Sequence, residues 1–220
     1  MFDSLLGRVH SALIAGRRRE AIAQAMGKVI AELKSPSESL LDVGCGDGVV
    51  ASILRDRVQG LEYVEGVEVI VPSSTSIPVR PFDGSSIPHN DKSFDVVLLC
   101  DVLHHVADYS GIVRLLSECG RVARKAVLVK DHPIDTAFDR KFISLLDTVG
   151  NWNAGIAMPL TFLSRGQWRH AFFDADLSPL HYSEAPFGIH PPIVRRFTEI
   201  PFWSKPYHFI CALAPNRRTP

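Results

Sequence analysis

The chain has 220 residues, 46% of them hydrophobic and 22% charged, which is ordinary for one globular domain with a substantial core. Lysine plus arginine and aspartate plus glutamate number 24 each, so no net field favours a nucleic acid or a membrane surface. We therefore expect a small-molecule partner and no nucleic acid. No run approaches the ~20 apolar residues of a membrane span, so we expect no membrane insertion.

The four cysteines are widely separated, form no CxxC pair and lie in or beside apolar stretches. They are Cys45, Cys100, Cys119 and Cys211. This pattern indicates reduced thiols rather than a disulfide framework. The first residues also lack the apolar core of a signal peptide. We therefore expect a cytoplasmic protein.

Residues 1–34 have helical periodicity, with one apolar stripe on each side of Gly16. The pattern predicts two helices that are broken near this glycine. Arg17, Arg18 and Arg19 follow it. A run of three charges is usually a solvated face, and a phosphate-binding patch is the less favoured interpretation.

Residues 40–48 are a short apolar run that ends in Asp42 and then three glycines at alternate positions. The glycines are Gly44, Gly46 and Gly48. The run predicts a strand leading directly into a ligand loop, because glycine allows positive φ and close approach of a ligand. A helix is predicted from Val49, with its unpaired N–H groups beside the loop. Asp42 can accept from a cationic amine, so these features suit a positively charged nucleoside.

Two other interpretations of the loop exist. One is a glycine-rich structural turn. The other is a dinucleotide site, because Gly46, Gly48 and Ala51 fit G-x-G-x-x-A and Glu68 follows roughly 20 residues later. Downstream features separate them: a second strand at 64–71 that carries Glu68, the segment Pro-Phe-Asp-Gly-Ser-Ser-Ile-Pro at 81–88, and a third apolar run at 94–100.

With these elements in order, residues 40–130 resemble the class I S-adenosylmethionine-dependent methyltransferases, in the small-molecule branch with an L-D-V-G-C-G-x-G loop. The resemblance implies an α/β fold: a Rossmann-like, doubly wound, mostly parallel seven-stranded sheet with helices on both faces and a C-terminal antiparallel strand. It implies S-adenosyl-L-methionine as cofactor. It also implies that residues 1–34 form a helical cap on a methyltransferase domain of residues 35–220, in one compact unit.

The resemblance further implies the cofactor-binding residues. Glu68 would accept hydrogen bonds from both ribose hydroxyls, and Asp83 would meet the adenine amino group beside the Gly84 N–H. A surface glutamate and a short polar turn are the alternatives for these two acids. The predicted cofactor-binding set is Asp42, Gly44, Cys45, Gly46, Gly48, Glu68, Asp83, Gly84 and Cys100.

Candidate catalytic residues follow two predicted strands: His104 and His105 after 94–100, and Asp131 and His132 after 126–130. We expect them at one carboxyl edge, where open α/β sheets bind ligands. A base is needed only if the acceptor must lose a proton, and imidazole titrates near neutral pH. His105 and His132 are the first candidates, with His104 behind them; local packing or hydrogen bonding is the alternative.

A metal site is a rival interpretation of these imidazoles and carboxylate. However, adjacent side chains at a helix start point about 100° apart, which makes His104 and His105 a poor chelating pair. We therefore expect no metal.

The rest of the chain predicts helices at 109–124, 137–149 and 167–175, the last opened by a capping box at Ser164 and Gln167. The loop at 150–161 carries Asn151-Trp152-Asn153 and Met158-Pro159, and the resemblance places it against the substrate. Strands at 181–185 and 207–214 would close the sheet as antiparallel neighbours.

The predicted reaction is methylation of a small molecule, with oxygen slightly favoured over nitrogen or carbon. The oligomeric state is not predicted. Two alternatives remain: an NAD(P)-dependent oxidoreductase that uses the glycine loop, and a catalytically silent subunit that binds S-adenosylmethionine.

Overall fold

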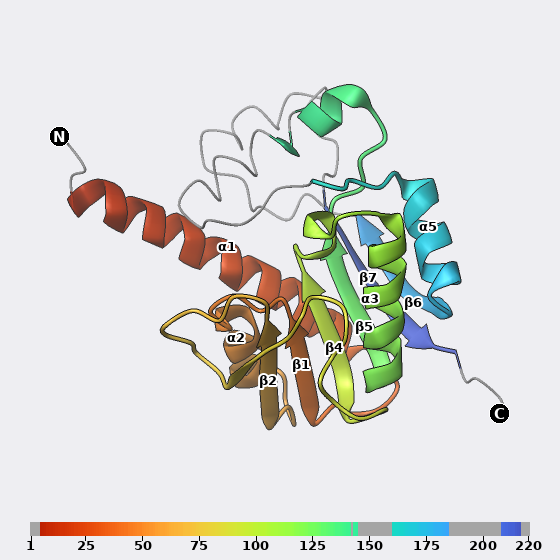
Figure 1. Cartoon of the computed structure of the whole chain (residues 1–220). Coiled ribbons are helices and arrows are strands. Elements are labelled where there is room, and N and C mark those ends of the chain that lie inside the picture. Colours follow the sequence, from red (N-terminus) through yellow and green to blue (C-terminus); the bar gives the residue numbers. More distant parts are fainter. Residues whose placement is uncertain (1–4, 142, 145–159, 185–207, 217–220) are drawn as a thin grey trace.

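The computed structural model describes residues 5–141, 143–144, 160–184 and 208–216, with side chains from residue 16 onward (Figure 1). Its described residues form a seven-stranded sheet in the order β3-β2-β1-β4-β5-β7-β6. The strands are β1 Ser39–Val43, β2 Tyr63–Glu68, β3 Val79–Pro81, β4 Phe94–Cys100, β5 Ala123–Asp131, β6 Leu177–Glu184 and β7 Phe209–Pro215. Strands β1 to β5 pair in parallel, and β7 is antiparallel to both β5 and β6. The predicted fold class is confirmed.

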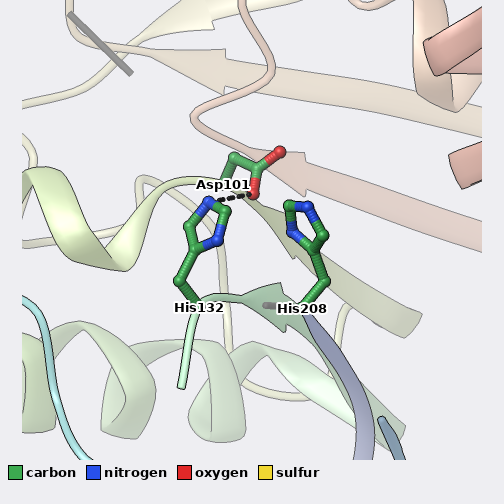
Figure 2. Close-up of side chains that lie close together, drawn as sticks. All are labelled: Asp101, His132 and His208. Atoms are coloured by element: carbon green, nitrogen blue, oxygen red, sulfur yellow. Dashed lines mark ion pairs between the residues drawn. The ribbon is translucent and has the colours of Figure 1, made fainter. Parts of the chain in front are cut away.

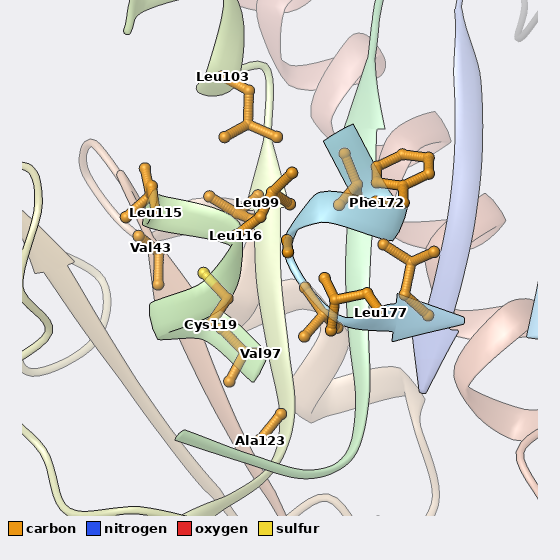
Figure 3. Packing of buried hydrophobic residues seen from close by; sticks show 14 of the residues in the cluster. Val43, Val97, Leu99, Leu103, Leu115, Leu116, Cys119, Ala123, Phe172 and Leu177 are labelled. Carbon is orange, nitrogen blue, oxygen red and sulfur yellow. The ribbon is translucent and has the colours of Figure 1, made fainter. Parts of the chain in front are cut away.

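The helices are α1 Leu5–Ala31, α2 Val49–Arg57, α3 Tyr109–Val122 and α5 Arg165–Asp174, with a short 3-10 helix, η1, at Leu103–His105. One core cluster joins α1 and α2 to the sheet through Met26, Leu54 and Leu98. A second joins α3 and α5 to the opposite face, where Leu99 and Phe172 are packed (Figure 3). Because helices cover both faces, β1 is buried along its whole length and β4 is buried up to its last residue, and most of their side chains are apolar.

Several predicted boundaries hold and some do not. Strand β4 has the predicted bounds, and α5 begins with the predicted reciprocal capping box of Ser164 and Gln167. Strand β2 ends at Glu68 rather than at residue 71. Strand β3 was not predicted, because it is a partly exposed strand of three residues that ends in a proline. Residues 137–141 and 143–144 are helical as predicted, whereas 145–149 and the predicted substrate-facing residues 151–153 and 158–159 lie outside the described residues.

The predicted helix break at Gly16 is wrong, because α1 continues through it. A Cβ added at Gly16 would meet nothing within 4 Å, so the glycine makes no close packing contact there. One glycine inside a helix costs only about 1 kcal/mol. Burial of Ile22, Met26 and Ile30 against the sheet offsets that cost, and it places this part of the predicted cap in the core of the domain. No helix in the described part of the chain is long and apolar enough to cross a membrane.

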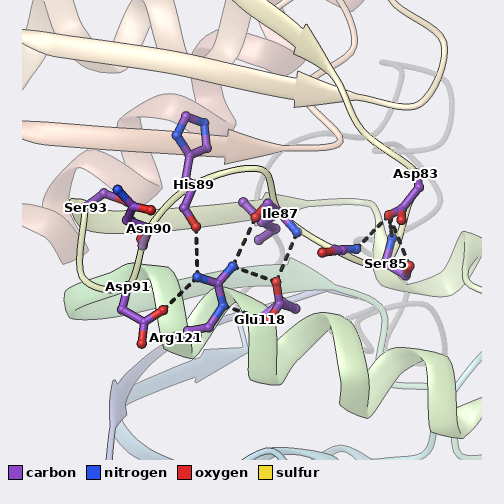
Figure 4. A network of polar contacts seen from close by, with 10 residues as sticks. Asp83, Ser85, Ile87, His89, Asn90, Asp91, Ser93, Glu118 and Arg121 are labelled. Carbon is purple, nitrogen blue, oxygen red and sulfur yellow. Dashed lines mark hydrogen bonds and ion pairs between the residues drawn. The ribbon is translucent and has the colours of Figure 1, made fainter.

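Arg121 of α3 binds the segment between β3 and β4 to this helix through hydrogen bonds (Figure 4). Its guanidinium donates to the carbonyls of Ile87 and His89 at 3.0 and 2.8 Å, and to Asp91 at 2.8 Å. Glu118 receives two further bonds from Arg121 and accepts from the Ile87 N–H. This network therefore holds in place the segment that begins with the predicted adenine-contacting residues.

We expect Arg121→Ala to lower the free energy of unfolding by about 2 kcal/mol, because two backbone carbonyls and a partly buried carboxylate lose their donors. Urea unfolding followed by circular dichroism measures the change. Arg114→Ala is the matched control on an exposed position of the same helix and should change stability by less than about 0.5 kcal/mol. Equal effects of the two substitutions would contradict the role assigned to the network.

Candidate cofactor and acceptor site

The glycine loop leaves β1 at Val43 with positive φ at alternate positions. The φ angles are 69° at Gly44, 55° at Gly46 and 72° at Gly48, which favour glycine. A Cβ at Gly44 would lie 2.7 Å from Val102, and one at Gly48 would lie 2.4 Å from Ile77. A Cβ at Gly46 would meet nothing within 4 Å. Two of the glycines thus permit close packing, and the middle one borders open space.

Glu68 ends β2 and faces this loop. Its Oε2 accepts from the Gly46 N–H at 2.7 Å, and its Oε1 accepts from the Val69 N–H at 2.8 Å. Because each carboxylate oxygen has two lone pairs, both retain the capacity to accept from a ligand hydroxyl. The hydrogen bond to Gly46 therefore fixes the position of the Glu68 carboxylate relative to the glycine loop, as a ribose-binding role requires.

Asp42 lies beneath the loop and is 2% exposed. Burial, followed by the nearby charges of Glu68 and Asp47, raises the pKa of Asp42 to about 8. Its Oδ1 has no hydrogen-bond partner among the described residues. A buried polar oxygen without a partner is costly, and a cationic amine would supply the missing donor and favour the ionised acid. This orphaned oxygen fits a cofactor with an amino group.

The two thiols of the predicted set, Cys45 and Cys100, both follow Asp42 in the chain. Cys45 packs against Gly66 of β2, where a Cβ would come within 2.4 Å of the sulfur. Cys100 ends β4 and is partly buried. Burial raises the pKa of both thiols, so they stay protonated near neutral pH. They offer no anionic group to the site.

The predicted adenine-contacting residues lie in a tight turn after β3. Asp83 Oδ1 accepts from the N–H groups of Ser85 and Ser86 and from the Ser85 hydroxyl, and these bonds lower the pKa of Asp83 (Figure 4). Gly84 has a φ of 82°, and a Cβ there would lie 3.4 Å from Val69. Asp83 is exposed, so the turn does not exclude contact with a ligand.

Sequence reasoning missed two apolar side chains at this end of the site. Val69 and Ile70 are 55% and 75% exposed, and they directly follow Glu68. Exposed apolar side chains beside the predicted ribose-binding acid and Gly84 would suit the flat face of a purine. The apolar run that continues past Glu68 was the available signal, although it was assigned to the strand.

The structure brings the predicted catalytic residues together at the carboxyl edge. His104 Nδ1 lies 2.8 Å from Asp131 Oδ1, and the His104 ring centroid lies 4.1 Å from that of His105 and 5.3 Å from that of His132. Burial would raise the pKa of Asp131, but the neighbouring His104 outweighs it and the pKa is lowered. Asp131 is therefore ionised, and we assign the proton of the hydrogen bond to His104 Nδ1.

A second group, centred on Asp101, includes residues that sequence reasoning missed (Figure 2). Asp101 has a φ of 57°, and its Oδ1 lies 2.5 Å from Lys130 Nζ and 3.5 Å from His132 Nε2. Its Oδ2 lies 2.9 Å from Arg18 of α1. His208, just before β7, faces the same group. Lys130 and His208 had no motif to mark them, because each is a single polar residue within an apolar stretch.

Charge and burial set the protonation of this second group. Lys130, Arg18 and the two histidines hold the pKa of Asp101 well below its usual range, although burial alone would raise it. Burial, then the charge of Lys130, lowers the pKa of His132 to about 4. The pKa of His208 is lowered well below its usual value for the same two reasons. Both imidazoles are thus neutral near pH 7.

Asp101, His132 and His208 each place one potential ligand atom within 4.8 Å of the others, which is metal-like spacing (Figure 2). The charges around Asp101 argue against a metal ion, because Lys130 and Arg18 already pair with its carboxylate. A divalent cation would add two charges beside a fully buried ammonium, at a high electrostatic cost. That no metal binds here stays a prediction.

Comparison with known proteins identifies the family. The profile of a family described as Methyltransferase domain matches residues 14–181. The chain belongs to this methyltransferase family. It is an S-adenosylmethionine-dependent methyltransferase, and S-adenosylmethionine is its cofactor. The dinucleotide interpretation of the glycine loop has no support.

The individual relatives are distant. Probable tRNA methyltransferase 9B of Mus musculus is 22% identical over 138 residues, which are 62% of this chain and 31% of that protein. The chain thus spans less than a third of this relative. In the complex between the Haloferax volcanii Trm112 methyltransferase activator and a methyltransferase, a chain that is 17% identical aligns with a TM-score of 0.68 over 97% of both chains.

Two further solved structures share the fold. A SAM-dependent methyltransferase of Methanosarcina mazei is 15% identical, with a TM-score of 0.58 over 84% of this chain and 95% of that one. Geranyl diphosphate C-methyltransferase of Streptomyces coelicolor A3(2), in complex with Mg²⁺, geranyl diphosphate and S-adenosylhomocysteine, is 14% identical. Its TM-score is 0.59 over 88% of this chain and 79% of that one.

The raised pKa of Asp42 generates a prediction about proton release. At pH 6.5 Asp42 is protonated in the free protein, and contact with a cationic amine would ionise it. Binding of S-adenosylhomocysteine should therefore release close to one proton. Calorimetric titration in two buffers of different ionisation enthalpy measures this number.

Asp42→Asn should abolish the release and weaken binding about 10-fold or more, because a charge-assisted hydrogen bond is lost. Asp56→Asn, at a mostly exposed carboxylate of α2, is the matched control and should release the same proton as the native protein. A native titration with no dependence on buffer would show that Asp42 does not face the amine.

Proposed function

We propose that this methyltransferase acts on a small molecule and that an oxygen atom is the favoured acceptor. The observation that carries the proposal is the buried His104–Asp131 pair at the carboxyl edge that also holds the glycine loop. S-adenosylmethionine supplies a methyl group on a sulfonium, which needs little covalent help. An acceptor hydroxyl, however, must lose its proton, and a base of fixed orientation serves that step.

The cofactor would be held by the residues that the resemblance implied. Asp42 would accept from its amine, Glu68 from the ribose hydroxyls, and Asp83 with the Gly84 N–H would meet the adenine. The open space beside Gly46 supports close approach of the ligand to the loop. We propose this role for the whole predicted set of Asp42, Gly44, Cys45, Gly46, Gly48, Glu68, Asp83, Gly84 and Cys100.

Among the three candidate bases, we favour His104. Its Nδ1–H donates to the ionised Asp131, so its Nε2 carries the lone pair and Asp131 stabilises the protonated ring. His132 is a weaker candidate, because a base with a pKa of about 4 retains a proton poorly near neutral pH. His105 lies beside His104, with ring centroids 4.1 Å apart and the rings tilted by 44°, and it stays a second candidate. Phe162 stacks on the His104 ring with centroids 5.7 Å apart, which helps to exclude water.

A methyl-transfer screen tests this proposal. Purified protein is incubated with S-adenosylmethionine that carries a labelled methyl group, against phenols, alcohols, carboxylic acids, amines and bulk transfer RNA. We expect turnover on a hydroxyl-bearing small molecule. The transfer RNA arm is included because a curated relative is named for that activity. Turnover on transfer RNA alone would overturn the proposal, and so would intact S-adenosylhomocysteine binding without turnover on any acceptor, which would indicate a silent subunit.

On the acceptor so found, His104→Gln should lower kcat about 10²- to 10⁴-fold, because the general base is lost. The Kd for S-adenosylhomocysteine should stay within about twofold, since only the acceptor side is altered. His170→Gln, at an exposed position of α5, is the matched control and should leave kcat unchanged. An unchanged kcat in His104→Gln would reject His104 as the base.

A further inference from the structure

Trp168 of α5 donates a hydrogen bond to the backbone beside the proposed base pair. Its indole Nε1–H lies 3.1 Å from the carbonyl oxygen of His132, and the residue is only 2% exposed. The indole packs against the rings of Phe209 and Phe172, with centroids 5.1 and 5.7 Å apart. This packing fixes the direction in which the indole donates its hydrogen bond.

The carbonyl of His132 lies where β5 leaves the sheet. Among the described residues, the strand pairing of β5 ends at Asp131, one residue earlier. Pro133 follows, and a proline has no N–H group to donate. The hydrogen bond from Trp168 therefore holds this carbonyl at a point where strand pairing no longer does.

The backbone of His132 in turn determines where the Asp131 carboxylate lies. The Oδ1 atom of Asp131 accepts from the His132 N–H and from His104 Nδ1, both at 2.8 Å. Its Oδ2 atom accepts from the Leu103 N–H at 3.1 Å. Two of these donors are backbone groups, one beyond β4 and one beyond β5. A displacement of the His132 backbone would therefore move the carboxylate that orients His104.

The stretch that leads into α5 also contacts the other side of this pair. Thr161 donates its N–H to the carbonyl of His104 at 2.8 Å, and the Phe162 ring stacks on the imidazole of the same residue. One continuous stretch of the chain, residues 161–168, thus bonds to the backbone of both His104 and His132.

We propose that Trp168 is a positioning residue for methyl transfer, whose indole N–H keeps the Asp131 carboxylate aligned with His104. It acts through the backbone of His132 and does not touch the acceptor. This inference rests on the proposed role of His104 as the base. A carboxylate supports an imidazole base only while the Nδ1–H points at it, and a small misplacement of a catalytic group costs a large factor in rate.

Removal of the indole N–H tests the proposal. Trp168→Phe removes the donor, and replacement of Trp168 by benzothienylalanine removes it while it keeps the shape of the ring. Proton NMR follows the Nδ1–H resonance of His104, which is assigned by its disappearance in His104→Gln. We expect both replacements to shift or broaden this resonance. On the acceptor found in the screen, they should lower kcat about 10- to 100-fold and leave KM within about twofold.

The pH dependence of kcat supplies a second readout. The fall of kcat on the acid side should move to lower pH in both Trp168 replacements, because an imidazole that loses the support of a carboxylate is less basic. Phe172→Leu is the matched control, since it alters packing beside the same indole with a side chain that cannot form hydrogen bonds. It should leave the resonance and the pH profile unchanged, and kcat within about twofold.

The other outcomes overturn the inference in distinct ways. Equal changes in Trp168→Phe and Phe172→Leu would mean that Trp168 only packs the core. If His104→Gln lowers kcat and neither Trp168 replacement changes kcat or the resonance, the proposed base stands and only this inference fails. If His104→Gln leaves kcat unchanged, the proposed base fails and this inference fails with it, even where the Trp168 replacements shift the resonance.

Discussion

Parallel pairing of β1, β4 and β5 is the constraint on which the whole site depends. Asp42 pairs in register with Leu98, and Leu98 pairs with Leu128. Asp101 and Asp131 each come three residues after those partners, so both lie beyond the same row at the carboxyl edge. Parallel strands in register therefore bring three carboxylates from distant parts of the chain to one edge of the sheet.

Asp42 and Asp131 are buried and Asp101 is partly buried, and the three carboxylates differ in charge because their neighbours differ. Burial, followed by the charges of its acidic neighbours, keeps Asp42 protonated in the free protein, and its Oδ1 has no hydrogen-bond partner among the described residues. Asp101 is held ionised by Lys130 and Arg18, and Asp131 by His104. The three carboxylates at this edge therefore differ in what they can do. Asp42 can accept a cationic ligand group, Asp101 is already paired with cations of the protein, and Asp131 orients the imidazole of His104. This division suits a zwitterionic cofactor beside an acceptor that loses a proton.

Packing on both faces keeps this edge in place. Helices α1 and α2 cover one face, and α3 and α5 cover the other (Figure 1). The same helices also carry polar groups to this edge: α1 provides Arg18, and α3 holds the segment after the Asp83 turn through Arg121. Elements that build the core therefore also position the charged groups at this edge.

Local patterns in the sequence were sufficient for much of this protein. The alternating glycines, the nearly continuous apolar run of β4 and the capping box at Ser164 predict structure within a few residues, because backbone conformation and hydrogen bonding there are decided locally. The adjacency of His104, Asp131 and His132 also followed, since parallel strands end at a common edge. The ordered motifs further identified the methyltransferase family and its cofactor.

Tertiary structure alone decided the composition of the Asp101 group, the continuity of α1 and the protonation of Asp42. Lys130 and His208 are single polar residues in apolar stretches, and Arg18 belongs to a run of three arginines that resembles a solvated face. Only the packing of α1 and the antiparallel pairing of β7 with β5 bring these residues to Asp101. The local sequence around Gly16 predicts a helix break, yet packing of the following turns keeps α1 continuous. The proton on Asp42 is likewise a property of the folded site, because burial and neighbouring charge set a pKa, and neither exists in the extended chain.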